Sequence, residues 1–258
     1  MLDALRSTNV ALLAVPFALK VAAVFAASVR LSTVLGTLDV SVKPLDLWRV
    51  LMFGETINKV VPAGIGSIAY TTVKVGSSTK TLLSQIFDKV AFLVVMLVAG
   101  ATAAAYNGQW RLVAACTTAL VVGLLASAIA VNVMGPVLGE PQAMLRSLIA
   151  SLAPGGGASA RYLVASLASL ACMSLAFWLL WAACNTPIPV GYAVACTAIV
   201  TVAIAVPVTI NGIGLREWAI VLTLGPLDLP NATLALVILL AYAIGFAASL
   251  LGYFMSLW

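Results

Sequence analysis

The chain has 258 residues, of which 63% are apolar and only 8% are charged, and its formal net charge is +5. Soluble domains carry about 25% charged residues, so this composition excludes a soluble domain although the length would suit one. The apolar runs are continuous and do not alternate with polar residues, which argues against a membrane β-barrel. We therefore expect a single all-α, polytopic transmembrane domain over residues 1–258.

The first predicted element is a full membrane span at residues 9–29, because a crossing helix needs about 20 apolar residues. Lys20 interrupts this run, so the segment does not look like a cleavable signal peptide. A lysine inside a span is a functional candidate, although snorkelling of its long stem to the interface explains it equally well.

The next region, residues 45–76, is interrupted by proline and glycine. It is long enough to enter and leave the bilayer as a helical hairpin broken at Pro62–Gly66, and we expect it to be re-entrant. The alternative is a poor span with a proline kink. Two full spans are expected to follow, at residues 82–106 and 112–133.

The middle of the chain contains the one obvious linker. Residues 140–152 place apolar side chains on one helical face, which predicts a short interfacial helix, and a Gly-rich joint follows at residues 153–159. We expect residues 134–159 to separate a first half, residues 1–133, from a second half, residues 160–258. An internal duplication of the two halves is a reasonable inference.

Three more full spans are expected at residues 162–183, 190–210 and 231–257, which makes about six in total. Residues 211–225 are expected to be a second re-entrant segment, with one short helix after a glycine break. Both broken segments contain Gly-Ile-Gly, starting at Gly64 and at Gly212, 148 residues apart. Paired interruptions of this kind in two halves of a membrane protein point to a transport site.

Basic residues are distributed unevenly between the two expected faces. One face holds only Arg6 and Arg111, so the other face is expected to be cytoplasmic, with both termini outside. The nine residues on the expected cytoplasmic face are Arg30, Lys43, Arg49, Lys74, Lys80, Lys89, Arg146, Arg161 and Arg216. The positive charge suggests contact with anionic lipid, and no basic face outside the membrane indicates nucleic-acid binding.

Catalytic motifs are largely missing from the sequence. There is no histidine, which excludes His-based acid–base relays and His zinc sites. The four cysteines form no C-x-x-C pair, and the eight carboxylates form no cluster that would hold Mg²⁺. We therefore expect no catalytic residue, no metal and no cofactor, and a chain that is not an enzyme.

Three segments carry a resemblance to a known family. Asn58 to Val75 looks like an N-x-x-x-P-x-x-x-G segment, and Phe87-Asp88-Lys89-Val90 resembles an acidic-basic pair at the start of the next span. Thr209 to Ala219 is close to an N-G-[IL]-G-[VL]-R-E-x-A signature. Their order and spacing resemble the lysylphosphatidylglycerol synthase transmembrane region family, the membrane domain of the multiple peptide resistance factor lipid flippases, over roughly residues 9–225.

The sequence departs from this family at two places. Gly64-Ile65-Gly66-Ser67 stands where members usually have Gly-Gly-Asp and then Arg, and Lys89 stands where Arg is usual. No soluble aminoacyl-transfer domain follows, so lipid aminoacylation is not expected of this chain. The resemblance thus implies a flippase-type membrane domain and leaves the identity of its lipid open.

The broken segments predict a phosphate site. A helix that begins inside the membrane directs free N–H groups and a positive dipole end at the cavity in front of it. Packing glycines, an interfacial Arg216–Glu217 pair and an Asp88–Lys89 span edge are the structural alternatives. The expected substrate-binding residues are Asn58, Lys59, Pro62, Gly64, Gly66, Lys74, Asp88, Lys89, Asn211, Gly212, Gly214, Arg216 and Glu217.

We expect a flippase-like translocator in a bacterial or archaeal cell membrane, which moves an anionic phospholipid or a lipid-linked sugar between leaflets. One alternative is a non-catalytic membrane partner of a glycolipid or cell-envelope synthase. The other is a membrane-embedded lipid transferase that uses Asp88, Glu217 and asparagine side chains, which the missing acidic cluster disfavours. The expected partners are an anionic membrane lipid, an envelope-biosynthesis enzyme and a second copy of the chain, but no nucleic acid.

Overall fold

Four long helices dominate the computed structural model, which describes residues 8–59, 61, 65–76, 78–121, 146–150, 156–205 and 213–256. They are α2 (Ala14–Gly36), α5 (Ser78–Tyr106), α8 (Gly157–Ala183) and α11 (Asn231–Ser256), and the short 3-10 turn η1 (Val10–Leu13) precedes α2. Within the described ranges, these four helices are long and apolar enough to cross a membrane. The expectation of an all-α membrane protein is confirmed.

The first interrupted region is a helical hairpin. α3 (Pro44–Ile57) has 14 residues and α4 (Ile65–Val75) has 11, so they are only about 21 and 16 Å long against a hydrocarbon core of about 30 Å. The two helices touch where a Cβ added at Gly54 would lie 2.8 Å from Ser67 Cβ. The side-chain oxygen of Asn58 accepts a hydrogen bond from the Ser67 N–H at 3.0 Å, which ties the end of α3 to the start of α4.

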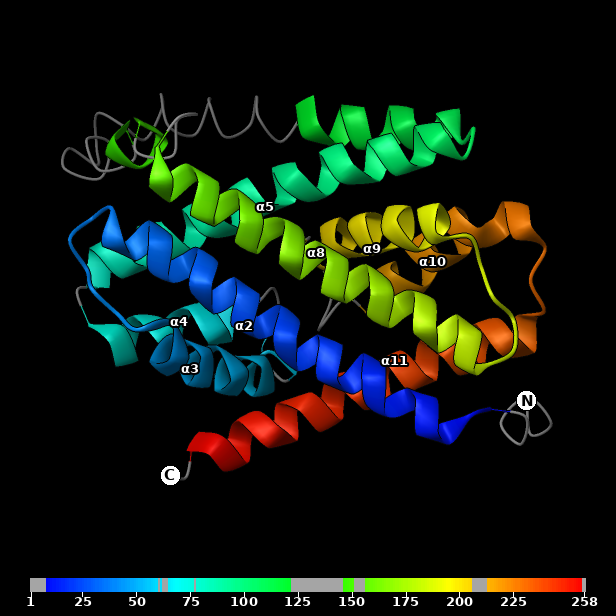
Figure 1. Ribbon diagram of the computed structural model, residues 1–258, viewed down its shortest axis with the longest axis horizontal. Coiled ribbons are helices and arrows are strands. Elements are labelled where there is room, and N and C mark those ends of the chain that lie inside the picture. Colours follow the sequence, from blue (N-terminus) through cyan, green and yellow to red (C-terminus); the bar gives the residue numbers. More distant parts are fainter. Residues whose placement is uncertain are drawn as a thin grey trace.

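The second interrupted region also contains two short helices that run in opposite directions (Figure 1). α9 (Val190–Ala205) is described over 16 residues, about 24 Å, of the full span expected at residues 190–210, and the last five of those expected residues lie outside the described residues. α10 (Leu215–Leu224), extended by the 3-10 turn η3 (Gly225–Leu227), then runs back. Leu224 near its end packs in one cluster with Ala193 at the start of α9 and Trp181 at the end of α8.

The two hairpins enter from opposite ends of the molecule (Figure 1). The α3–α4 hairpin starts at the end where Lys80 of α5 donates a hydrogen bond to the carbonyl of Leu38 after α2, at 2.9 Å. The α9–α10 hairpin starts at the other end, where Gln109 donates to the carbonyl of Thr223 at 3.2 Å. The order long, short, short, long therefore occurs twice, in opposite directions, as α2–α5 and as α8–α11.

This arrangement corrects the predicted topology. Both termini were expected on the same side of the membrane. Instead, α2 and α11 run in the same direction, so the chain begins and ends at opposite ends of the molecule (Figure 1). The reason is the return of α10, which removes one expected crossing. The basic residues outside the interior still favour one end, because the helix termini at Lys43, Lys74, Lys80 and Arg161 lie together at the left of Figure 1.

Several predicted boundaries fall at the edge of the described residues. The helix expected at residues 112–133 begins at Trp110 and is described as far as Val121. Of the expected interfacial helix, residues 146–150 are described and are helical, while most of the expected linker lies outside the described residues. α8 begins at Gly157, so the last part of the expected Gly-rich joint belongs to this helix.

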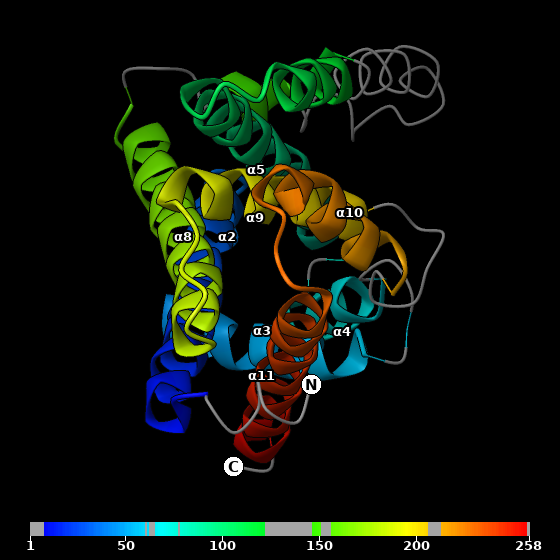
Figure 2. The same ribbon diagram turned by 90° about the vertical axis from the view of Figure 1, so that its right-hand side faces the viewer.

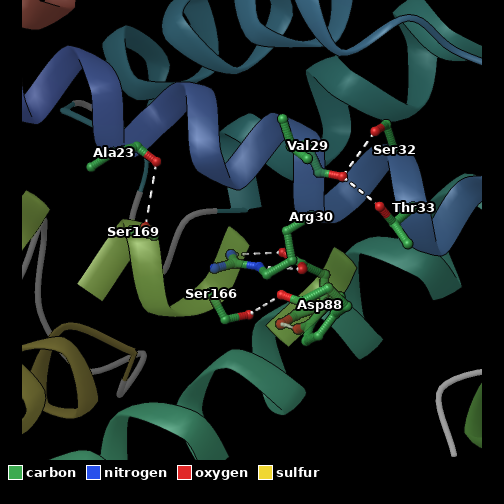
Figure 3. Close-up of polar contacts among 9 residues, drawn as sticks. Ala23, Val29, Arg30, Ser32, Thr33, Asp88, Ser166 and Ser169 are labelled. Carbon is green, nitrogen blue, oxygen red and sulfur yellow. Dashed lines mark hydrogen bonds and ion pairs between the residues drawn. The ribbon is translucent and has the colours of Figure 1, made fainter. Parts of the chain in front are cut away.

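The pair α2 and α8 forms the central contact of the bundle, and small residues line it. Ser169 of α8 donates a hydrogen bond to the carbonyl of Ala23 in α2 at 3.4 Å, and Ser166 and Ser169 are buried (Figure 3). Small residues allow the backbones of membrane helices to approach closely, which is the main source of packing energy in a lipid solvent. This contact positions α2, whose Arg30 side chain extends toward the interior.

A candidate head-group cavity between the two hairpins

A cavity of about 500 Å³ lies in the interior and is lined by residues of α2, α3, α5, α8, α9, α10 and α11. Figure 2 shows these helices around the centre of the molecule. A second cavity of about 210 Å³ adjoins it, and Lys20, Arg30, Glu55 and Lys89 line both. The combined space reaches from the α3–α4 hairpin to the start of α10.

The wall of the larger cavity is apolar over much of its area but strongly cationic. Glu55 is the one carboxylate among the described residues that line it, and it lies 3.8 Å from the ammonium group of Lys20. Lys59, just after α3, lies against the middle of α11, where a Cβ added at Gly245 would be 3.4 Å from its nitrogen. The five cations on the wall are Lys20, Arg30, Lys59, Lys89 and Arg216.

Arg30 and Asp88 form a buried, two-point ion pair between α2 and α5. The guanidinium group donates to the two carboxylate oxygens at 2.5 and 3.0 Å, and both side chains are less than 10% exposed (Figure 3). The guanidinium also lies 3.8 Å from the centre of the Phe92 ring, and Tyr162 of α8 donates to the Asp88 carbonyl at 3.1 Å. The second terminal nitrogen of Arg30 has no hydrogen-bond partner in the described part of the chain.

This pair corrects one expectation. Arg30 was expected on the cytoplasmic face, but α2 continues to Gly36 and buries it. Asp88 stands beside Lys89 in the acidic-basic pair of the family resemblance, but neighbouring residues on a helix do not face each other, and the carboxylate of Asp88 is bonded to Arg30.

The start of α10 forms a second polar cluster. Gly214 has φ +89°, a conformation that favours glycine, and its N–H donates to the carboxylate of Glu217 at 2.6 Å. The Tyr242 hydroxyl of α11 donates to the other oxygen of Glu217 at 2.5 Å. The Arg216 guanidinium lies 4.6 Å from the centre of the Tyr242 ring, and its buried Nε has no hydrogen-bond partner among the described residues. Glu217 therefore caps the helix and holds Tyr242, while Arg216 lines the cavity.

The sequence profile described as "Lysylphosphatidylglycerol synthase TM region" matches residues 1–252. The chain belongs to this family. The match extends past the expected residues 9–225 and includes most of α11, from which Tyr242 contacts Glu217. No curated protein and no solved structure matches the chain. Membership in a family of membrane domains, together with the apolar helices, makes the chain a multi-pass membrane protein with a role connected to membrane lipids.

The structure of this family member brings part of the predicted site together. Asn58, Lys59, Lys89 and Arg216 line the larger cavity, and Asp88 lines the smaller one. Both hairpins contribute, since Lys59 follows α3 and Arg216 is the second residue of α10. Among the other predicted residues, Pro62, Gly64, Asn211 and Gly212 lie outside the described residues.

Other predicted residues lie away from the cavity wall. Gly66 is a packing position, because an added Cβ would overlap Ile57 of α3. Lys74 is exposed near the end of α4, where its ammonium group lies 5.8 Å from the Tyr70 ring centre. Gly214 and Glu217 shape the start of α10 and are absent from the described lining.

Four residues at or next to the cavity are missing from the predicted site: Lys20, Arg30, Glu55 and Tyr242. The first three are ionisable groups in apolar segments, and such groups are functional candidates inside a membrane. Lys20 was recognised as a functional candidate but was not assigned to the site, and applying the same rule to every charge between residues 14 and 57 would have added Arg30 and Glu55. Tyr242 carries no comparable signal, because a tyrosine in a span is ordinary.

Proposed function

We propose that this chain moves a lipid with an anionic head group between the leaflets of a membrane, by way of the cavity between the two hairpins. One observation carries the proposal: two helical hairpins that enter from opposite ends contribute cations to the wall of one interior cavity. Interrupted helices at the binding site and opposed repeats are features of secondary transporters. No step in this proposal requires nucleotide hydrolysis.

Cations on the cavity wall would replace the hydration that a phosphate group loses when it leaves water. Placing a bare charge in hydrocarbon costs several kcal/mol at least, and Lys59 and Arg216 would offset that cost. The volume of about 500 Å³ falls within the range of about 300–1,000 Å³ that is usual for small-molecule sites. Apolar residues of the same wall, such as Phe177 and Ile244, would face the part of the lipid next to the acyl chains.

The start of α10 adds a second source of positive potential. Its first turn carries unpaired N–H groups and the positive end of the helix dipole, and Arg216 lies in that turn. The carboxylate of Glu217, held by Gly214 and Tyr242, offsets part of this potential, which leaves Arg216 as the main positive group of the turn. In this proposal, Arg216 is the residue of α10 that contacts the phosphate.

The test is transport in vesicles. The purified chain is reconstituted into phosphatidylcholine vesicles that contain an anionic lipid with a fluorescent acyl chain, and a quencher that cannot cross the bilayer reports arrival in the outer leaflet. Wild-type protein is expected to speed exchange well above the rate in empty vesicles. Arg216→Ala is expected to slow exchange about tenfold or more, because a charge-assisted contact to the head group is lost.

Arg111→Ala is the matched control, because Arg111 is an exposed arginine at the start of another helix and is not among the cavity-lining residues. Its exchange rate should equal that of the wild type, and both variants should unfold at the wild-type temperature. An unchanged rate in Arg216→Ala removes this residue from the mechanism. Exchange no faster than in empty vesicles contradicts translocation and favours the alternative of a membrane partner for an envelope synthase.

A further inference from the structure

The charge in the cavities is larger than a single phosphodiester would balance. The two adjoining cavities are lined by five cations and by the carboxylates Glu55 and Asp88, which leaves an excess of three positive charges among the described residues. Counting the nearby carboxylate of Glu217 still leaves an excess of two. Like charges gathered on one wall repel each other, and an occupant of opposite charge compensates them.

The cations are also arranged in two groups. Lys20, Arg30 and Lys89 line both cavities and form one group, while Lys59 and Arg216 line only the larger cavity and form the other. Each group has a buried guanidinium nitrogen with no hydrogen-bond partner in the described ranges, namely Arg30 Nη1 and Arg216 Nε. Arg30 is only 4% exposed, so its unpartnered nitrogen is shielded from bulk water.

We propose, on the basis of the translocator function above, that the cargo is a lipid whose phosphate head carries at least two negative charges, a phosphomonoester or a diphosphate. Such a head group meets both cation groups and balances the excess charge. A phosphodiester such as phosphatidylglycerol carries one negative charge and leaves at least one cation uncompensated. A head group with an added amine fits less well, because the excess of cations repels it.

The experiment compares lipids of different head-group charge in the same vesicles at pH 8, where a phosphomonoester carries its second charge because that pKa is about 6. The probes are phosphatidic acid, a polyprenyl diphosphate and phosphatidylglycerol, each with the fluorophore on its hydrocarbon chain. Phosphatidic acid or the polyprenyl diphosphate is expected to move about tenfold faster than phosphatidylglycerol, since a further unit charge near cations is worth at least that factor. The faster of the two identifies a monoester or a diphosphate as the natural head group.

A double variant tests the cavity as the origin of this preference. Lys59→Gln with Arg216→Gln is expected to reduce the advantage of the doubly charged lipids to about twofold or less. The matched control is Lys74→Gln with Arg161→Gln, which removes the same charge from exposed positions and should keep the wild-type preference. Comparison of the three lipids in the wild type alone keeps the test valid if the first variant fails to fold.

The outcomes separate this inference from the proposed function. Phosphatidylglycerol moving as fast as the doubly charged lipids, or faster, overturns the charge argument and leaves translocation standing. If none of the three lipids moves faster than in empty vesicles, the translocator function itself fails. A preference that survives in the Lys59 and Arg216 double variant places the selectivity elsewhere and also overturns the inference.

Discussion

A buried ion pair links two of the long helices. Arg30 and Asp88 are 58 positions apart in sequence yet share two hydrogen bonds in a buried setting. Removing one member of a buried ion pair leaves the other charge without compensation, which costs far more than the loss of an exposed pair.

The first prediction concerns this pair. Asp88→Asn is expected to lower the free energy of unfolding by about 3–5 kcal/mol, because it leaves the Arg30 charge buried without a counter-ion. The measurement is the thermal unfolding midpoint of the purified protein in detergent. The control is Asp46→Asn, which breaks the exposed 3.8 Å contact with Arg49 and should cost about 1 kcal/mol or less. Equal effects of the two variants would contradict the assigned role of Asp88.

The second prediction concerns Glu55, the one carboxylate in the described lining of the larger cavity. In the proposed function it competes with the lipid for Lys20, from which it lies 3.8 Å away. Glu55→Gln is therefore expected to bind an anionic lipid roughly tenfold more tightly, because the carboxylate that competes for Lys20 is removed.

Affinity is measured by titration of the fluorescent lipid into protein in nanodiscs. Asp46→Asn serves again as the control, since it removes a carboxylate from the same helix without touching the cavity. Weaker or unchanged lipid binding in Glu55→Gln would show that this carboxylate does not compete with the head group.

At the level of helices, close backbone contacts hold the α3–α4 hairpin against α11. Thr56 of α3 donates a hydrogen bond to the carbonyl of Ser249 at 2.6 Å, and the rings of Phe53 and Tyr253 stack at 6.4 Å between their centres. A Cβ added at Gly252 would lie 2.2 Å from the carbonyl oxygen of Met52, so α11 comes this close only because residue 252 is glycine.

The third prediction follows from that contact. Gly252→Ala is expected to destabilise the protein by about 1–3 kcal/mol, because the methyl group meets backbone that cannot move aside as a side chain would. Thermal unfolding is again the measurement. Gly157→Ala at the start of α8 is the control, since its Cβ meets nothing within 4 Å and should leave stability unchanged or slightly raised. A loss as large in the control as in Gly252→Ala would contradict the contact.

The helices also show how far the sequence determines the structure. The break after α3 is predictable, because Pro62 and Gly64 are unfavourable inside a helix. The end of the described part of α9 at Ala205 has a local signal as well, because Pro207 stands two residues further along the chain. The return of α10 depends on its packing against α8 and α9, which no local pattern encodes.

The same distinction holds for the site. Lys59 and Arg216 are predictable because each stands next to a break in the chain. The Arg30–Asp88 pair and the contact of Tyr242 with Glu217 join residues of different helices, and a single sequence does not show which helices are neighbours. What was predicted correctly came from local backbone chemistry, and what was missed came from tertiary contacts.

For the molecule as a whole, two opposed hairpins imply a definite membrane orientation. Lys43 and Lys80 lie at the end where the α3–α4 hairpin starts, and this basic end is expected to be cytoplasmic. Residues 228–230, between α10 and α11, then lie on the outer side, whereas a full span at residues 190–210 would place them inside.

The fourth prediction tests this orientation. A cysteine at Pro230, which is exposed, is expected to react in intact cells with a maleimide that cannot cross the membrane. A cysteine at Lys43 should react only after the cells are opened. The wild-type chain is the control for its own cysteines, three of which are buried. Protection of the Pro230 position in intact cells would contradict the return of α10.

The contact between α3 and α11 has a consequence for how the protein is made. Thr56 and Ser249 are separated by 193 residues, so at about 5–20 residues per second the ribosome needs roughly 10–40 s to supply the partner of the first hairpin. During that time the exposed groups of Met52 and Phe53 face lipid, the translocation machinery or a chaperone. Newly made chains that stop before α11 are therefore expected to be degraded by membrane proteases faster than the complete chain.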